Sequence, residues 1–178
     1  MSKRGAFLKR LPSNGIVAEI GVYEGAHATK IIEYSKPEKL YLIDPWCDHN
    51  TPYINSLENY SKDGKYEERY AKVQDMFKDS ENVELIKKFS MNAVTMFPDE
   101  FFDWIYVDAD HTYPKIKEDL NAWYPKIKEK GYICGHDYSE RKINIFGVKK
   151  AVDEFIKDRN LKINLRIKTE WAIRKIII

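Results

Sequence analysis

Four polar residues in the second half of the chain have types and spacing that suit a metal-binding or catalytic site. Asp108 follows the apolar run 101–107, with His111 three residues later, and His136 and Asp137 follow the apolar run 132–134. Carboxyl ends of adjacent parallel strands lie side by side, so we expect these side chains at one sheet edge. Asp108 and Asp137, with His136 as a third ligand, would bind Mg²⁺, or a transition metal if the imidazole takes part. Strand-end acids also cap helices, and each acid alone fits that role.

A second group of candidate residues lies in the first quarter of the chain. Glu19 precedes Gly21, and Gly25 follows at the expected start of a helix. Glycine permits a tight turn and a close approach of the backbone to a ligand. The spacing is GxxxG, so it is not the GxGxxG fingerprint of dinucleotide-binding proteins. Asp44, at the end of the next apolar run, would accept hydrogen bonds from ribose hydroxyls or cap the turn before Pro45.

Short apolar runs alternate with amphipathic segments along the chain. The pattern predicts strands over 16–20, 40–44, 83–86, 101–107 and 132–134, and helices over 26–34, 67–77, 116–128 and 147–157. Pro125 is expected to kink or end the helix over 116–128. Two last β segments, 161–168 and 170–177, have only a short turn between them. Strands alternating with helices indicate parallel βαβ units. The expected fold is α/β, a doubly wound, mostly parallel seven-stranded sheet with a C-terminal antiparallel hairpin, in one domain over 1–178.

The segment 45–64 departs from this alternation. It is polar, aromatic and turn-rich, and includes Trp46, His49 and Tyr60. It leaves the carboxyl end of the second expected strand, the edge at which α/β sheets bind ligands. The segment is interpreted as a lid or a substrate-contacting insertion, with a passive surface loop as the alternative.

Composition excludes several classes of protein. The 30 basic and 28 acidic side chains give a net charge of +2, which argues against a nucleic-acid binder. Basic clusters such as Lys3-Arg4, and His27 on the expected helix 26–34, are interpreted as surface residues. Two widely spaced cysteines indicate neither a zinc site nor a disulfide framework, and the sequence shows no signal peptide or membrane span. We therefore expect a cytoplasmic protein with no membrane partner.

The residues from Ala18 to Asp44 resemble the first two motifs of class I S-adenosylmethionine-dependent methyltransferases, which have a Rossmann-like fold. The resemblance implies that Glu19 supports the amino-acid end of S-adenosylmethionine and that Asp44 holds its ribose. Gly21 and Gly25 would border the cofactor. Ser90 and Met91 fall where the family usually contacts adenine.

The stretch 108–155 resembles one branch of that family, the metal-dependent methyltransferases that act on macrolide sugars and related metabolites. The similarity includes Asp-x-x-His-x-Tyr from Asp108, Trp123-Tyr124-Pro125, and Asp137-Tyr138. It implies Mg²⁺ at Asp108, His136 and Asp137, and His111 as the general base with Asp108 in the catalytic site. His136 stands where the branch usually has an acid, which favours weak binding, another metal or none.

Four other functions are compared with the sequence. Two YxxxK matches suggest a short-chain dehydrogenase, but its glycine-rich opening is missing. A nucleic-acid methyltransferase would carry an Asn/Asp-Pro-Pro-Tyr/Phe motif where this chain has Asp108 to His111. A non-catalytic module that binds S-adenosylmethionine remains an alternative, as does a metal-independent enzyme with another acceptor. We expect a methyltransferase acting on a hydroxyl group of a small molecule, and a homodimer is compatible with the sequence.

Overall fold

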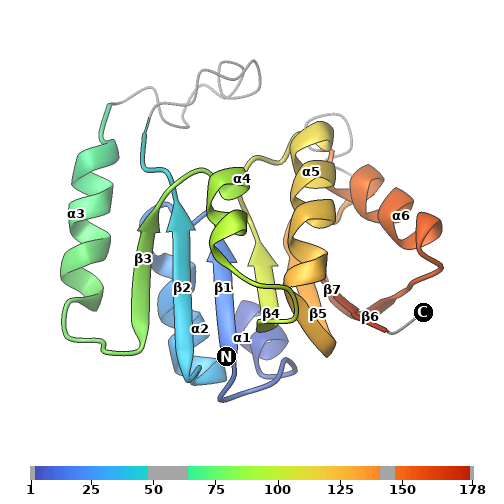
Figure 1. The fold of residues 1–178 in the computed structure, drawn as a ribbon, viewed down its shortest axis with the longest axis horizontal. Coiled ribbons are helices and arrows are strands. Elements are labelled where there is room, and N and C mark those ends of the chain that lie inside the picture. The colour runs from blue at the N-terminus through green and yellow to red at the C-terminus, as the bar shows by residue number, and fades with distance from the viewer. Residues whose placement is uncertain (1–2, 48–63, 141–146, 177–178) are drawn as a thin grey trace.

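The computed structural model describes residues 3–47, 64–140 and 147–176. In these residues seven strands form one mixed sheet in the order β3-β2-β1-β4-β5-β7-β6 (Figure 1). The strands are β1 (Ile16–Ile20), β2 (Lys39–Asp44), β3 (Val83–Lys87), β4 (Phe102–Val107), β5 (Ile127–Gly135), β6 (Ile163–Ile167) and β7 (Glu170–Arg174). β1 to β5 are parallel, and β7 is antiparallel to both β5 and β6. The expected α/β fold with a C-terminal antiparallel pair is confirmed.

Helices cover both faces of the sheet. α1 (Lys3–Leu8), α2 (Ala26–Ser35) and α3 (Tyr66–Phe77) share one buried apolar cluster with the sheet. α5 (Tyr113–Trp123) and α6 (Val148–Asp158), together with the segment of α4 (Ser90–Ala93) and the short helix η2 (Val94–Met96), pack on the other cluster. Figure 1 shows α4 and α5 in front of the sheet, with α1 and α2 behind it. Ligands that bind such a sheet meet it at the carboxyl ends of the strands.

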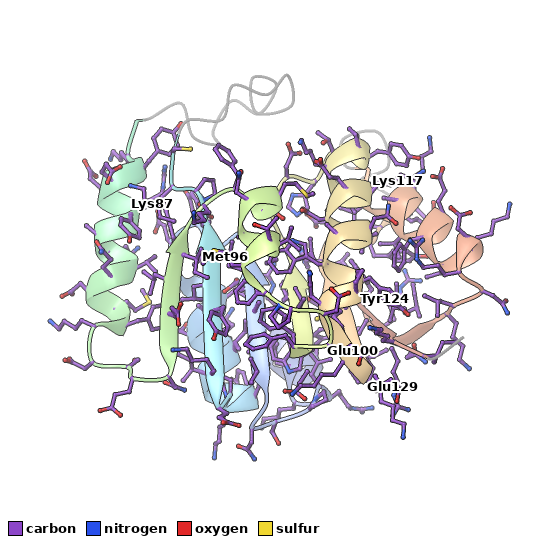
Figure 2. The ribbon with its side chains drawn as sticks, viewed as in Figure 1. Lys87, Met96, Glu100, Lys117, Tyr124 and Glu129 are labelled. Atoms are coloured by element: carbon purple, nitrogen blue, oxygen red, sulfur yellow. The ribbon has the colours of Figure 1, made fainter. Side chains whose placement is uncertain are left out.

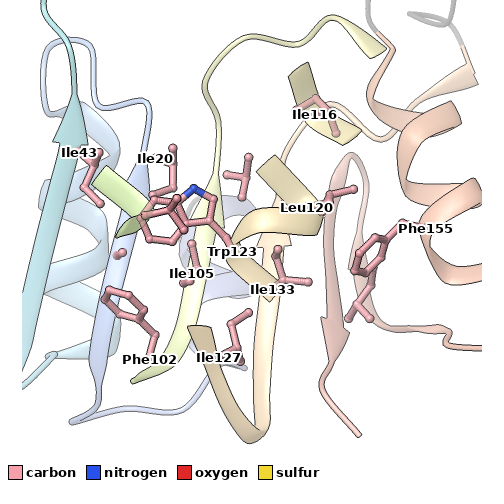
Figure 3. Close-up of a cluster of buried hydrophobic side chains, with 14 of the residues drawn as sticks. Ile20, Ile43, Phe102, Ile105, Ile116, Leu120, Trp123, Ile127, Ile133 and Phe155 are labelled. Carbon is pink, nitrogen blue, oxygen red and sulfur yellow. The ribbon is translucent and has the colours of Figure 1, made fainter. Parts of the chain in front are cut away.

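Side chains of the central strands alternate between the two clusters. In β1, Val17 faces the side of α1 and α2, whereas Ile20 faces the side of α5. Figure 3 shows the α5 side, where Ile20, Ile105 and Trp123 meet between the sheet and the helix. A strand that is buried on both faces needs apolar residues at nearly every position, which explains the continuous apolar run of β4.

Charged side chains lie mainly around the periphery of the fold. Glu100 and Glu129 are both exposed and lie at the end of the molecule opposite the carboxyl ends of the parallel strands (Figure 2). Within the described residues, no helix has both the length and the apolar character needed to cross a membrane.

Proline and the short helices account for the differences from the expected elements. The helix expected over 116–128 runs from Tyr113 to Trp123, and Pro125 lies in the 3₁₀ helix η3 (Tyr124–Lys126). Pro114 suits the first turn of the helix because proline has no N–H to leave unpaired there. α1 and α4 were not predicted, since helices of six and four residues show too little periodicity. Most of the expected lid, 48–63, lies outside the described residues.

Gly21 occupies a tight point of the fold, where the end of β1 passes the end of β4. Its φ is +90°, and a Cβ atom there would lie 2.4 Å from the carbonyl oxygen of Asp108. The backbone N–H of Gly21 donates to Ile43, and that of Asp108 donates to Ile20. Any side chain at this position would therefore push apart the ends of two central strands.

Gly21→Ala is expected to lower the free energy of unfolding by more than about 3 kcal/mol, because backbone strain and overpacking add together. Gly64→Ala is the matched control. Gly64 also has a positive φ of +66°, but a Cβ atom there would have none of the described atoms within 4 Å. The control should lose only about 1–2 kcal/mol. Urea unfolding of both variants measures the difference, and equal losses would contradict the steric argument.

Candidate functional site

A cavity of about 270 Å³ opens at the carboxyl ends of β1 and β4. Because β1 connects to β2 on one side and pairs with β4 on the other, this is the point where the strand order reverses, the usual ligand site of α/β sheets. The residues around the cavity come from α1, the end of β1, the β1–α2 loop, the start of α2, the β4–α5 loop and the residues after β5. They are Arg4, Glu19, Gly21, Val22, Tyr23, Glu24, Ala26, His27, Asp108, His111, His136 and Asp137.

Asp108 and His111 form a hydrogen-bonded pair in this cavity. Nε2 of His111 lies 3.0 Å from Oδ1 of Asp108 and 3.9 Å from Oδ2 of Asp137. The backbone positions the imidazole, since the carbonyl of His111 accepts a 2.7 Å hydrogen bond from the N–H of Gly147. Burial acts to raise the pKa of Asp108, but the hydrogen bond from His111 and the charge of Arg4 outweigh it and hold that pKa below its ordinary value. The carboxylate therefore stays ionised beside the imidazole.

Arg4 reaches the same carboxylate from α1. Its Nη2 lies 3.6 Å from Oδ2 of Asp108, and its Nε donates a 3.1 Å hydrogen bond to Glu170. The second carboxylate oxygen of Glu170 accepts a hydrogen bond from the buried hydroxyl of Tyr106. The interpretation of Arg4 as a surface residue is wrong, because its guanidinium lies at the cavity and balances two acids.

His136 and Asp137 lie beside this group at the end of β5. Nδ1 of His136 is 3.1 Å from Oδ1 of Asp137, and Nε2 is 3.0 Å from the hydroxyl of Thr169. Burial acts to lower the pKa of His136, but the contact with Asp137 and the charge of Asp108 outweigh it, so the pKa lies above its ordinary value. Both ring nitrogens of His136 thus already have partners within the chain.

The arrangement does not fit the magnesium site expected at Asp108, His136 and Asp137. One oxygen of Asp108 faces the imidazole of His111, and the other faces the guanidinium of Arg4. Over residues 3–47, 64–140 and 147–176, no three His, Cys, Asp or Glu side chains are grouped so that they could hold a metal ion. As expected from the sequence, Asp108, His136 and Asp137 lie around one cavity. The sequence analysis did not identify Arg4, which places a positive charge beside Asp108, where a metal ion was expected.

Glu19 and His27 form a second pair, deeper in the cavity. Oε1 of Glu19 lies 3.0 Å from Nδ1 of His27, and the imidazole packs on the ring of Tyr106 at 4.1 Å between centroids. Burial raises the pKa of Glu19 despite the opposing effect of His27. The interpretation of His27 as a surface residue is wrong, since it is only 5% exposed. Its position in the first turn of α2, close after a strand-end acid, was the signal available in the sequence.

Asp44 and Gly25 shape the loop that follows β1. The carboxylate of Asp44 accepts hydrogen bonds from the backbone N–H groups of Val22, Tyr23 and Trp46, at 2.8–3.0 Å. This is the turn-capping alternative considered from the sequence. Asp44 does not line the cavity described above. Gly25 precedes α2 with φ +78°. Oδ1 of Asp44 accepts one hydrogen bond, from Trp46, and a carboxylate oxygen can accept two. The contact between Asp44 and a ribose stays a prediction.

Ser90 and Met91, the expected adenine contacts, lie at the start of α4 and away from the cavity lining. The hydroxyl of Ser90 donates to Asp119 and accepts a 2.8 Å hydrogen bond from the indole of Trp123. Met91 is exposed. Burial raises the pKa of Asp119 to about 7. The Ser90 hydroxyl therefore connects α4 to α5, and the adenine contact stays a prediction.

Asp119 should make the stability of the protein fall as pH rises. With its pKa raised from 3.8 to about 7, the folded state binds more protons than the unfolded state between pH 4 and 7. The free energy of unfolding should lose up to about 4 kcal/mol over this window. Asp119→Asn keeps an acceptor for Ser90 and should remove this slope, whereas Asp75→Asn on exposed α3 should keep it. Urea unfolding from pH 4 to 8 measures both, and identical slopes would refute the assignment.

A family model described as a methyltransferase domain matches residues 18–138. A protein of Acanthamoeba polyphaga mimivirus, "Uncharacterized protein R132", is 28% identical over an alignment of 127 residues that covers 68% of this chain and 51% of that protein. The chain thus spans about half the length of that relative.

Solved structures share the fold at low sequence identity. The O-methyltransferase NovP superposes with a TM-score of 0.67 at 17% identity, covering 98% of this chain and 80% of NovP. The N-methyltransferase NodS from Bradyrhizobium japonicum gives 0.64 at 14%, covering 98% and 96%. Aeropyrum pernix fibrillarin, with natively bound S-adenosyl-L-methionine, gives 0.60 at 12%, covering 96% and 71%.

Proposed function

The chain belongs to the methyltransferase-domain family, and from that premise we propose that it transfers a methyl group from S-adenosylmethionine to a hydroxyl of a small molecule, with His111 as general base. The observation that carries this proposal is the hydrogen-bonded pair of His111 and Asp108 at the carboxyl ends of β1 and β4. A base positioned by a carboxylate is the arrangement that hydroxyl groups require, because an alcohol is a poor nucleophile until its proton is removed.

Asp108 orients the imidazole of His111 and stabilises its protonated form. When Nε2–H donates to Asp108, the lone pair resides on Nδ1, which is the atom that accepts the proton from the acceptor hydroxyl. The ionised carboxylate then stabilises the imidazolium that forms. The acceptor oxygen attacks the methyl carbon as the bond from that carbon to the sulfonium sulfur breaks, which leaves S-adenosylhomocysteine. Alignment of these atoms can lower the activation free energy by about 7–11 kcal/mol.

The fit of S-adenosylmethionine rests on the deeper part of the cavity. Oε2 of Glu19 is buried and has no hydrogen-bond partner among the described residues, and an ammonium group would satisfy it. The acidic side chains around the cavity also suit a donor that carries a sulfonium cation. These acids, with the net charge of +2, favour a small hydroxylated acceptor over a polyanion such as nucleic acid.

Charge balance within the chain supports a reaction without a divalent cation. Arg4 and His111 already face both oxygens of Asp108, and Arg4 also pairs with Glu170. The positive charge beside Asp108 is therefore supplied by Arg4.

His111→Gln is expected to reduce methyl transfer by about 10²–10⁴-fold, the usual contribution of a general base. Transfer is measured as release of S-adenosylhomocysteine with a panel of sugars and phenols. The variant should still bind S-adenosylhomocysteine by calorimetry, and Lys115→Gln, at an exposed position on α5, should react like the wild type.

Undiminished turnover in the His111 variant would refute its role as base. A wild-type protein that binds S-adenosylhomocysteine but methylates none of these acceptors would favour the non-catalytic module over this proposal.

Treatment with EDTA is expected to leave both the rate of methyl transfer and the affinity for S-adenosylhomocysteine unchanged, because Arg4 occupies the position of a cation beside Asp108. The measurement compares protein dialysed against EDTA with the same protein after addition of Mg²⁺ or Mn²⁺. A rate that is lost with EDTA and restored by either metal would show that the carboxylates rearrange around a metal ion.

A further inference from the structure

Tyr113 belongs to two of the motifs found in the sequence, and the cavity explains its place in neither. It ends the Asp-x-x-His-x-Tyr stretch that begins at Asp108, and it begins one of the two YxxxK matches. Tyr113 is the first residue of α5 and follows His111, the proposed base, by two positions. It does not line the cavity, and its side chain is in contact with α6 instead.

The side chain of Tyr113 is held by charged residues of α5 and α6. Its hydroxyl donates a hydrogen bond to Glu154 of α6, which also accepts a 3.1 Å hydrogen bond from Lys117 of α5. Nζ of Lys150, also on α6, lies 4.3 Å from the centre of the tyrosine ring. The hydrogen bonds from Tyr113 and Lys117 hold the pKa of Glu154 below its ordinary value. Glu154 therefore stays ionised at neutral pH and accepts both bonds.

Gly147 holds the backbone of the same turn. Its N–H donates a 2.7 Å hydrogen bond to the carbonyl of His111, and its own carbonyl accepts a hydrogen bond from Ala151 in the first turn of α6. A Cβ atom on Gly147 would lie 2.1 Å from the backbone nitrogen of Tyr113 and 2.2 Å from its Cα atom. Backbone atoms cannot move aside as the end of a flexible side chain can. Only glycine therefore lets the start of α6 approach this turn so closely.

Burial fixes the position of α6 against α5. Four apolar residues of α6 are buried in the same cluster as Ile116 and Leu120 of α5. They are Val148, Ala151, Val152 and Phe155. Figure 1 shows the two helices side by side. A close-packed interior is stiff and transmits strain, so contacts made from α6 can hold the turn that carries His111.

We propose that Gly147 and Tyr113 are positioning residues for the general base, because together they fix the turn from which His111 reaches Asp108. This inference rests on the proposed function and adds to it two residues outside the cavity lining. A general base must lie within hydrogen-bond reach of the proton that it removes. A displacement of about 1 Å can slow a reaction by about 10²-fold. Changes at either position should therefore lower kcat and leave ligand binding unaltered.

Gly147→Ala should lower kcat by about 10²-fold, measured with whichever sugar or phenol of the panel the wild type methylates fastest. KM for that acceptor and the calorimetric affinity for S-adenosylhomocysteine should not change. Gly131→Ala is the matched control, since a Cβ atom there would lie 2.5 Å from the carbonyl oxygen of Asp103 in a part of β5 that does not line the cavity. It should lower the thermal unfolding temperature but not kcat.

Tyr113→Phe is the second variant, and it keeps the ring and removes only the hydroxyl. It therefore tests the proposal even if Gly147→Ala does not fold. Its kcat should fall by about 3- to 10-fold, the usual effect of losing one hydrogen bond, with KM unchanged. Tyr124→Phe is the control. Tyr124 packs on Phe155 of α6 and lies toward the opposite end of α5 from Lys117 (Figure 2), so this variant should react like the wild type.

Combination with His111→Gln separates a positioning role from a merely structural one. If Gly147 and Tyr113 act through the imidazole, neither Gly147→Ala nor Tyr113→Phe should slow the residual reaction of His111→Gln any further. A further loss in folded double variants, equal to the loss in the single variants, would overturn the proposal. Wild-type kcat in the folded single variants, together with a slow His111→Gln, would overturn this inference alone. Undiminished turnover by His111→Gln, or no turnover by the wild type, would refute the proposed function itself.

Discussion

The close passage of Gly21 across the backbone of Asp108 is the constraint on which the rest of the site depends. It holds the ends of β1 and β4 within van der Waals contact, and hydrogen bonds from Gly21 to Ile43 and from Asp108 to Ile20 maintain the crossing. Because the two loops are fixed there, Glu19 and Asp108 border one cavity although 89 positions of sequence separate them. Asp44 also holds the β1–α2 loop in place, because its carboxylate accepts hydrogen bonds from the backbone N–H groups of Val22 and Tyr23.

Beneath α1 and α2 the sheet carries buried polar side chains within an otherwise apolar layer. Glu19, Tyr106 and Glu170, from β1, β4 and β7, are each less than 5% exposed. Buried polar groups are tolerated when they are paired, and here Arg4 and His27 provide partners for the two acids. Two atoms of this layer, on Glu19 and His27, have no partner among the described residues, and both residues line the cavity. The same side chains therefore belong to the buried layer of the fold and to the lining of the cavity.

Charge compensation inside the cavity also bears on the comparison with metal-dependent methyltransferases. The acids that would hold a cation are present, but Arg4 reaches them from a helix of only six residues. A guanidinium is always charged and donates in a fixed planar geometry, so Arg4 can pair with Asp108 and Glu170 at the same time. The placement of an arginine from another element beside Asp108 is a tertiary effect, and the local motif around Asp108 gives no sign of it.

The sequence by itself determined the order of strands and helices, the antiparallel end of the sheet, and the set of residues at the strand ends. These features follow from local periodicity, glycine positions and strand-end acids, which depend on neighbours along the chain. Pro114 in the first turn and Pro125 after the last turn set the ends of α5. The helices α1 and α4 were too short to be recognised from the sequence. Only the tertiary structure decided that Arg4 and His27 belong to the site, that both nitrogens of His136 are occupied, and that Ser90 bonds to Asp119 and Trp123. The physical reason is that burial and pairing of polar groups depend on which elements pack together, and residues far apart in the chain supply both partners.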